Sequence, residues 1–429
     1  MERNYIDSGN PIIGNIPKGW QLMRLKNVGY LYGGLTGKAG DDFDVDEDKD
    51  NFAYYIPFTN IFSNTYISPN VLGKVKVSDK EIQNKVHKGD LLFLMSSEDF
   101  DGIGKPAVID FELDNLYLNS FCKGFRITSD INFKYLNYMM SSHVERELVR
   151  LEAKGFIRIN LRQDKLACCE IIIPSRLEQD KIADYLDTKC GEIDSLIGLQ
   201  TEMIEKLKAY KQSVITEAVT KGLDPNAKLV QSGIDWIGEI PEEWKVCKLK
   251  NQYTLLNGRA YSDSELLQEG KYRILRVGNL FSSDKWYYSD MELEDNKYCS
   301  ENDLLYGWSA SIGPLIWKGE KVIYHYHIWK VLFYENNLRF SYYLFDALTH
   351  AKKRDMHGSA MQHLTKTNMD NSWIPTVPID QQHSIAAYLD EKCADIDHLI
   401  ALKQQKIEKL EDYKKSIICE AITGKITID

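Results

Sequence analysis

Residues 179–220 read QDKIADYLDTKCGEIDSLIGLQTEMIEKLKAYKQSVITEAVT, and residues 382–423 read QHSIAAYLDEKCADIDHLIALKQQKIEKLEDYKKSIICEAIT. The two stretches are aligned at a constant offset of 203, and 24 of their 42 positions are identical. Self-similarity at a fixed offset is the signature of an internal repeat. The sequence therefore predicts that one structural unit is built twice.

Both copies of this stretch are expected to be long helices. Their apolar residues recur in steps of three and four, which is typical of one helical face. Ser175-Arg176-Leu177-Glu178 has the capping-box pattern at the start of the first helix, and Gly222 and Pro225 follow its expected end. Roughly 40 residues make a rod on the order of 60 Å. We expect the two rods to pair antiparallel in a pseudo-twofold arrangement, the alternative being two surface helices packed on their own domains.

Each predicted helix follows a globular segment whose entrance is also repeated. Ile13-Gly14-Asn15-Ile16-Pro17 and Trp20 recur as Ile237-Gly238-Glu239-Ile240-Pro241 and Trp244, here at an offset of 224. Short β-type runs separated by Gly, Asn and Asp turns fill the middle, and helical stretches are expected near 132–152 and 340–354. The expected fold class is α+β: two mixed α/β domains dominated by a curled sheet, separated by two long antiparallel helices. The expected boundaries are 1–175 and 176–222 for the first copy and 223–377 and 378–429 for the second.

Composition indicates the cellular compartment of the chain but does not decide whether its partner is nucleic acid. No apolar stretch reaches the roughly 18–20 residues of a membrane helix, and the start lacks a signal-peptide pattern, so we expect a cytoplasmic chain without a membrane partner. Eight scattered cysteines suit reduced thiols. The net charge of −10 argues at first against nucleic acid, but Asp41–Asp50 alone holds seven acids and one lysine. We expect a solvated loop there, with a regulatory or metal role as the alternative.

Three motifs recur in order in both halves. Ile-Gly-x-Ile-Pro-x-x-Trp opens each domain, Asp-Leu-Leu follows Gly89 and Asn302, and Gln-x-x-Ile-Ala-x-Tyr-Leu-Asp opens each helix. In this combination the chain resembles the specificity subunit of Type I restriction-modification systems over essentially its whole length. Two departures put details in doubt: the turn at Asn302, where the first copy has glycine, and the start of the second helix, which lacks the capping box.

The resemblance implies a DNA sequence-specificity subunit without catalysis of its own. It implies two target-recognition domains, each reading one half of a split site in double-stranded DNA. It also implies that the helices set the spacing and dock two modification subunits, which bind S-adenosylmethionine and methylate adenine; this chain would hold no cofactor. Whether restriction (translocase/nuclease) subunits join the complex stays open.

The residues themselves give no sign of catalysis or of a metal site. The Asn-Pro-Pro-aromatic loop of an adenine methyltransferase is absent. His325-Tyr326-His327 has no ligand partner at a recognisable spacing, which favours packing or polar DNA contact. Glu98, Asp99 and Asp101 near Lys105 faintly resemble a nuclease arrangement, but a polar loop is the expected structure.

DNA-reading residues are expected where the scaffold is shared but the side chains of the two copies differ. Cationic, amide and hydroxyl side chains reach base edges, and glycines allow close backbone approach. In the first copy, segment 96–105 and segment 154–160 with Arg162 meet this condition, and in the second copy segments 308–313, 352–354 and 358–363 do. The candidates are Ser96, Ser97, Lys105, Lys154, Arg158, Asn160, Arg162, Trp308, Ser309, Ser311, Lys352, Lys353, Arg354, Gln362 and His363.

The helices are expected to supply the partner-binding surface. The candidates are Tyr185, Leu186, Ile193, Leu207, Tyr210, Tyr388, Leu389, Ile396, Leu410 and Tyr413. A second hypothesis is a protein-interaction scaffold of such a complex that keeps the helices but does not read DNA, which the acidic charge suggests. Charge reversal at the cationic candidates discriminates the two.

Overall fold

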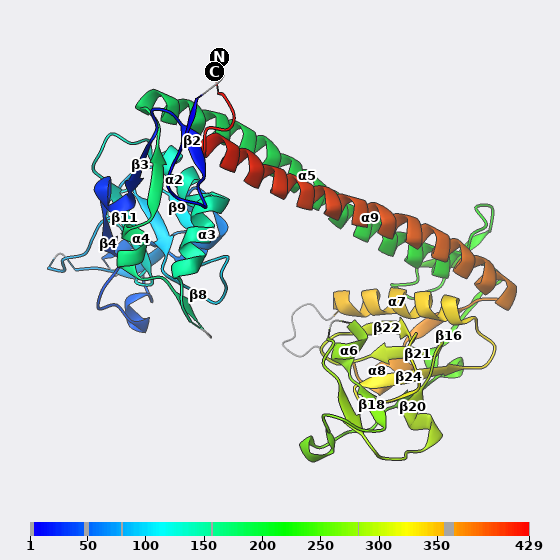
Figure 1. The fold of residues 1–429 in the computed structure, drawn as a ribbon. Helices are drawn as coiled ribbons and strands as arrows, with labels where there is room; N and C mark the ends of the chain where they lie inside the picture. Colours follow the sequence, from blue (N-terminus) through cyan, green and yellow to red (C-terminus); the bar gives the residue numbers. More distant parts are fainter. Residues whose placement is uncertain are drawn as a thin grey trace. The chain divides into compact units, whose positions relative to one another are not determined.

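The computed structural model describes residues 4–46, 51–78, 80–155, 158–281, 283–355 and 364–428. The chain forms two compact units, each with one globular domain (Figure 1). Unit one is Met1–Gln200 with Gln405–Asp429, and unit two is Thr201–Gln404. Helices α5 (Arg176–Lys221) and α9 (Ile379–Ile422) therefore each contribute one part to unit one and one part to unit two.

Domain one, the globular part of unit one, is built around a four-stranded sheet of order β4-β11-β7-β9. A second sheet of the domain has three strands, in the order β10-β5-β6. In sequence order the elements are β1 (Tyr5–Asp7), β2 (Asn15–Pro17), β3 (Gln21–Arg24), β4 (Gly29–Gly33), β5 (Phe52–Ile56), α1 (Phe58–Ser63), β6 (Gly73–Lys76), β7 (Leu91–Leu94), β8 (Ser96–Ser97), β9 (Pro106–Val108), β10 (Leu116–Leu118), β11 (Cys122–Ile127), α2 (Phe133–Ser141), α3 (His143–Glu152), β12 (Ile159–Asn160), α4 (Gln163–Ala167) and β13 (Glu170–Ile173).

Domain two, the globular part of unit two, repeats the first sheet with the order β17-β24-β21-β22. Its second sheet has four strands, in the order β19-β18-β23-β20. The elements are β14 (Leu229–Gln231), β15 (Glu239–Pro241), β16 (Lys245–Lys248), β17 (Tyr253–Asn257), β18 (Tyr272–Leu275), α6 (Val277–Phe281), β19 (Tyr287–Ser289), β20 (Tyr298–Cys299), β21 (Leu304–Gly307), β22 (Gly313–Ile316), β23 (Val322–Tyr324), β24 (Ile328–Phe333), α7 (Leu338–Asp355), α8 (Lys366–Asp370) and β25 (Trp373–Thr376).

The α+β class and the repeated domains with long helices are confirmed, but a single curled sheet is not what the domains contain. Most strands have only two to five residues, so turns divide them into several small sheets. The helical stretch near 132–152 is also broken, because Ser142 ends α2 and caps α3 by accepting a hydrogen bond from the Glu145 amide. Its counterpart α7 is continuous.

The turn at Asn302, which the sequence left in doubt, keeps its geometry. Gly89 has φ +89° and Asn302 has φ +69°, and asparagine is one of the few residues with a side chain that adopt this left-handed region readily. The aspartate that follows is paired with a cation in both domains. Arg126 Nη2 lies 2.7 Å from Asp90 Oδ2, and Lys330 Nζ lies 2.6 Å from Asp303 Oδ2.

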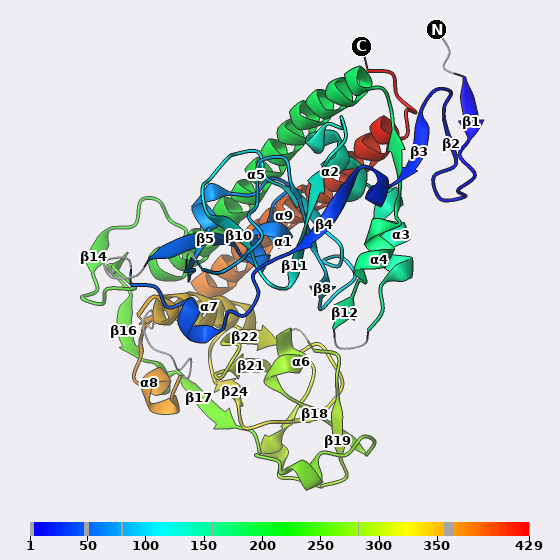
Figure 2. The same ribbon diagram turned by 90° about the vertical axis from the view of Figure 1, so that its left-hand side faces the viewer.

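Two ion pairs related by the repeat connect α5 with α9. In unit one Lys414 Nζ lies 2.7 Å from Asp194 Oδ2, and in unit two Lys211 Nζ lies 2.6 Å from Asp397 Oδ2. Within each unit the pairing is antiparallel, as expected, and Figure 2 shows the two helices running alongside each other. The aspartates are more than half exposed, so the pairs fix the register of the helices more than they stabilise the fold.

The repeated motif Tyr-Leu-Asp at the start of each helix joins that helix to its domain. Asp187 of α5 accepts hydrogen bonds from Tyr66, from Tyr138 of α2 (2.8 Å) and from Lys134 of α2 (2.7 Å). Asp390 of α9 accepts them from Tyr343 (2.7 Å) and Arg339 of α7. The motif is therefore a joint within each copy of the repeat.

The glutamine that opens the same motif makes a second contact at each joint. The Gln179 side chain accepts a hydrogen bond from the backbone amide of Asn132 at 2.9 Å, and the Gln382 side chain accepts one from the backbone amide of Asn337 at 2.8 Å. Each glutamine also donates to the carbonyl of a residue just before its helix, Pro174 or Val377. Two backbone groups at each helix entrance are thereby paired.

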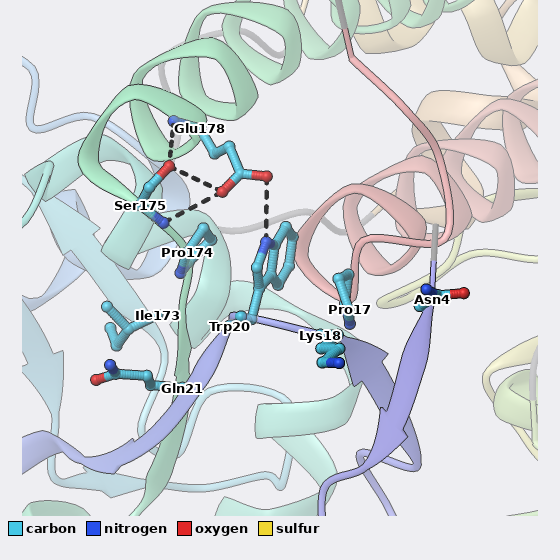
Figure 3. Close-up of a pocket in the computed structure, with 10 residues that line it drawn as sticks. Asn4, Pro17, Lys18, Trp20, Gln21, Ile173, Pro174, Ser175 and Glu178 are labelled. Atoms are coloured by element: carbon cyan, nitrogen blue, oxygen red, sulfur yellow. Dashed lines mark hydrogen bonds between the residues drawn. The ribbon is translucent and has the colours of Figure 1, made fainter. Parts of the chain in front are cut away.

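The entrance tryptophan of each domain binds the first turn of the helix. Figure 3 shows the Trp20 indole nitrogen pointing to Glu178, whose carboxylate accepts from it at 3.2 Å and from the Ser175 hydroxyl at 2.8 Å. The capping box predicted at 175–178 is thus confirmed. In domain two Trp244 donates to Gln381 at 2.8 Å. The second helix has no capping box, but it keeps the contact to the tryptophan.

One buried carboxyl group destabilises domain one at neutral pH. Glu145 of α3 is fully buried, and no hydrogen-bond donor among the described residues reaches either of its carboxylate oxygens. Burial, and secondarily the charge of Glu170, raises its pKa to about 8. The folded state binds the proton more tightly than the unfolded chain, so this group's contribution to stability is full below about pH 4.5 and is lost as the pH rises toward 8.

Replacing Glu145 with glutamine should remove this loss. We expect the stability advantage of Glu145→Gln over the original chain to grow by up to about 1.4 kcal/mol per pH unit between pH 5 and pH 8. Denaturant unfolding of both chains across this range measures it. A difference in stability that does not vary with pH would show that the carboxyl group is not protonated in the fold.

Within the described residues no helix is both long and apolar enough to cross a membrane. The eight cysteines are all unpaired, and Cys122, Cys169, Cys190, Cys299 and Cys393 are buried.

Candidate nucleic-acid interface

In domain one, the two segments chosen from the sequence lie together. Strand β12 pairs antiparallel with β8, which sets Asn160 against Ser96 and Ile159 against Ser97. The turn into β12 requires glycine at 155: its φ is +147°, and a Cβ there would lie 1.9 Å from the carbonyl oxygen of Arg158. Segments 96–105 and 154–162 therefore present one surface.

This surface contains a cleft of about 400 Å³, which we call cleft one. Its lining residues are Phe58, Phe62, Ser96, Ser97, Glu98, Asp99, Phe121 and Arg158. Phe121 is 58% exposed, and the Arg158 guanidinium lies 5.7 Å from its ring centroid. Exposed rings beside a cation are suited to stacking on nucleic-acid bases.

The remaining candidates of domain one do not line this cleft. Lys105 is turned toward Phe62, donating to its carbonyl, and burial lowers the pKa of its ammonium. Arg162 pairs with its neighbour Asp164 at 2.9 Å, and Lys154 is exposed. The nuclease-like arrangement does not form, because Asp99 accepts from the Gly102 amide at 2.6 Å and Asp101 pairs with Arg150. The expected polar loop is what the structure contains.

Domain two has a cleft at the equivalent place, also of about 400 Å³, which we call cleft two. It opens beside α6 as cleft one opens beside α1, and the same asparagine supports both: Asn60 Nδ2 donates to two loop carbonyls at 2.9 Å, and Asn279 Nδ2 donates to two at 3.0 and 2.9 Å. The lining residues are Arg276, Val277, Gly278, Asn279, Ser283, Lys285, Tyr287, Ser309, Ala310, Ser311, His325 and His327. The repeat therefore relates the two clefts.

Cleft two is cationic and aromatic. The charged groups of Arg276 and Lys285 each lie 5.3 Å from the ring centroid of Tyr287. The rings of His325 and His327 lie 4.8 Å apart, and burial, followed by the charges of His327 and Arg276, lowers the pKa of His325 to about 4. His325 is therefore a neutral hydrogen-bonding group at pH 7. The described residues contain no cluster of metal-ligand side chains.

The other candidates of domain two lie elsewhere. Trp308 packs: its indole donates to the Tyr326 carbonyl at 2.9 Å and its ring stacks on Trp329. Lys352, Lys353 and Arg354 are in the last turn of α7, and Arg354 lines a groove against α5 instead of cleft two. Gln362 and His363 fall outside the described residues.

The cleft residues that sequence reasoning missed are mostly aromatic or lie outside the chosen segments. They include Phe58, Phe62 and Phe121 in cleft one, and Arg276, Lys285 and Tyr287 in cleft two. The weak parallel between Asn60-Ile61-Phe62-Ser63 and Asn279-Leu280-Phe281-Ser282 in the two copies was the available signal.

The family model of the Type I restriction modification DNA specificity domain matches the chain twice, at residues 17–209 and 241–412. The chain belongs to the Type I restriction-modification specificity family. The MjaVIII specificity subunit of a type I restriction enzyme from Methanocaldococcus jannaschii is 24% identical, with 96% of this chain and 94% of that protein covered.

Two solved structures share the fold. One, described as showing complex assembly and conformational transition of the type I R-M system, aligns with a TM-score of 0.71 at 14% identity over 96% of this chain and 99% of that chain. The HsdS subunit from Thermoanaerobacter tengcongensis aligns with a TM-score of 0.50 at 15% identity, with 96% of this chain and 98% of that chain covered.

The structure divides the helix residues predicted from the sequence into three groups according to their exposure. Leu186 and Ile193 lie in the core of unit one and Leu389 lies in the core of unit two, and Ile396 is also buried, so these four side chains leave little surface for another chain. Tyr185, Leu207, Tyr388 and Leu410 are partly buried. Tyr210 and Tyr413 are 58% and 55% exposed.

Further exposed leucines lie on the same two helices. In unit one they are Leu196 and Leu199, and in unit two they are Leu399 and Leu402. The repeat relates the set Leu196, Leu199 and Tyr413 to the set Leu399, Leu402 and Tyr210. Each unit thus exposes the same apolar side chains, which the strict apolar stripe of the sequence did not distinguish from buried ones.

Proposed function

We propose that this specificity subunit reads a split site in double-stranded DNA, with cleft one in contact with one half-site and cleft two with the other. The observation that carries the proposal is the pair of clefts. They occupy equivalent places in two copies of one scaffold, and their lining residues differ. Two copies that read different sequences need this combination of a shared frame and divergent contacts.

We further propose that the exposed apolar sets on α5 and α9 dock two modification subunits. Exposed leucines and a tyrosine on a helix face support a protein contact, and their repetition supports two copies of the same partner. These subunits would carry S-adenosylmethionine and transfer the methyl group to adenine in the cytoplasm. The chain itself would contribute recognition and no catalytic residue.

The competing function is a scaffold that no longer reads DNA, which the net charge of −10 favours. Arg158→Glu tests the two functions against each other. If cleft one contacts DNA, reversal of this charge should lower kcat/KM for adenine methylation by the complex at least about 10-fold, because a contact to DNA is replaced by repulsion from phosphate.

Arg24→Glu is the matched control, since Arg24 is exposed on β3 and does not line cleft one. Methylation of duplex DNA by the complex, measured at one fixed salt concentration, gives the comparison. Equal rates for Arg158→Glu and Arg24→Glu would support the scaffold and remove the case for reading by cleft one.

A further inference from the structure

The two clefts differ in the sign of their charge. Cleft one is lined by the carboxylates of Glu98 and Asp99 and by one cation, Arg158. Cleft two is lined by Arg276 and Lys285, and its described lining contains no acidic residue. Because equivalent elements surround the two clefts, the difference in charge comes from the side chains that line them.

Glu98 is the carboxylate of cleft one that is available to a ligand. Asp99 already accepts from the Gly102 amide at 2.6 Å and orders the loop. Glu98 is exposed, and no residue in the described part of the chain forms a hydrogen bond or an ion pair with it. Phe62 and Phe121 line the same cleft with exposed rings. Cleft one therefore presents the Glu98 carboxylate, a hydrogen-bond acceptor, beside exposed aromatic rings.

A carboxylate restricts which part of DNA can face it. Phosphate repels it, and it can only accept hydrogen bonds. In the major groove the donors are the exocyclic amino groups, cytosine N4 and adenine N6, and the usual partner of a glutamate is cytosine N4. A cleft that places Glu98 against DNA therefore selects an amino group.

Arg276 offers the opposite chemistry in cleft two. Its side chain is exposed, and the Tyr287 ring under its guanidinium limits the directions in which the fork can point. A planar fork of donors matches O6 and N7 of guanine, whereas Lys285, a point charge on the same ring, suits a neighbouring phosphate. Neutral His325 adds no charge to the cleft, and because its Nδ1 accepts from the backbone amide of His327 at 3.4 Å, its Nε2 is left as a donor.

We propose that the two domains read DNA by opposite chemistry. Glu98 in cleft one selects an exocyclic amino group, cytosine first, in one half-site, and Arg276 in cleft two selects guanine in the other half-site. The inference rests on the proposed function, because it assigns the contacts through which the two clefts would read.

The test uses the chain in complex with its modification subunits and a set of duplexes in which each position of the methylated site is changed in turn. For Glu98→Gln, we expect discrimination at one base pair of one half-site to fall about 10- to 100-fold and to shift toward adenine, since an amide can pair with adenine N6 and N7. For Arg276→Gln, we expect a loss of the same size at a guanine of the other half-site. Asp114→Asn and Lys318→Gln are the matched controls on exposed residues outside the clefts.

The thermal midpoint of each variant, measured beside its control, shows that the fold is kept. The inference is overturned if either variant leaves discrimination unchanged, if it weakens methylation equally on every duplex, or if both variants act on the same half-site. A wild-type complex that prefers no split site would instead overturn the proposed function, so the two failures are distinguishable.

Discussion

Asp187→Ala is expected to lower the free energy of unfolding of unit one by about 2–4 kcal/mol. The carboxylate accepts from Tyr66, Tyr138 and Lys134, so its loss leaves two hydroxyl groups and one ammonium without their acceptor at the joint between α2 and α5. A protein of this size should show a fall of several degrees in the midpoint of thermal unfolding. Calorimetry or denaturant unfolding measures the change.

Asp184→Ala is the matched control, because Asp184 is an exposed acid one turn earlier on the same helix. It should change stability by less than about 0.5 kcal/mol. In unit two Asp390→Ala should reproduce the loss, since Asp390 accepts from Tyr343 and Arg339 in the same way. If Asp187→Ala and Asp184→Ala unfold alike, the repeated aspartate is not a joint.

The second large effect concerns assembly. Tyr413→Asp should remove one modification subunit from the complex, Tyr210→Asp should remove the other, and the double variant should bind none. A charge placed in an apolar contact must be desolvated without a partner, which opposes binding by several kcal/mol. The mass of the purified complex, measured by light scattering, reports the number of subunits bound.

Tyr334→Asp is the control for this experiment, because Tyr334 is 89% exposed, directly follows β24 and is not part of either helix. It should leave the composition of the complex unchanged. Two modification subunits retained by the double variant would show that the exposed apolar sets are not the docking surface.

The repeat predicted the architecture well because identical residues in two copies mark what both copies need to fold. Asp187 and Asp390 are identical for this reason, and both hold a domain to its helix. Leu186 and Leu389 are also identical, and both are buried in a domain core, so identity between copies does not separate core residues from surface residues. Periodicity does not reveal which part of an apolar stripe the helix's own domain covers.

The clefts were harder to predict, because a difference between the two copies does not show whether a residue contacts a ligand or is simply free to vary. Segments 96–105 and 154–162 were chosen for their polar residues, and their meeting depends on the pairing of β8 with β12, two short strands with no distinctive pattern. Phe121 and Arg276 carry no sequence signal of their own. Phe121 lies in the turn between β10 and β11 and Arg276 lies between β18 and α6, so each reaches its cleft only after the neighbouring strands have paired.

We propose that one chain reads two half-sites with two copies of one scaffold. A genome-wide map of methylated adenines in cells that contain the complex tests it most directly. The account predicts that every methylated site contains two defined and different half-sites separated by an undefined gap of constant length. A single uninterrupted motif, or methylation without any motif, would contradict it.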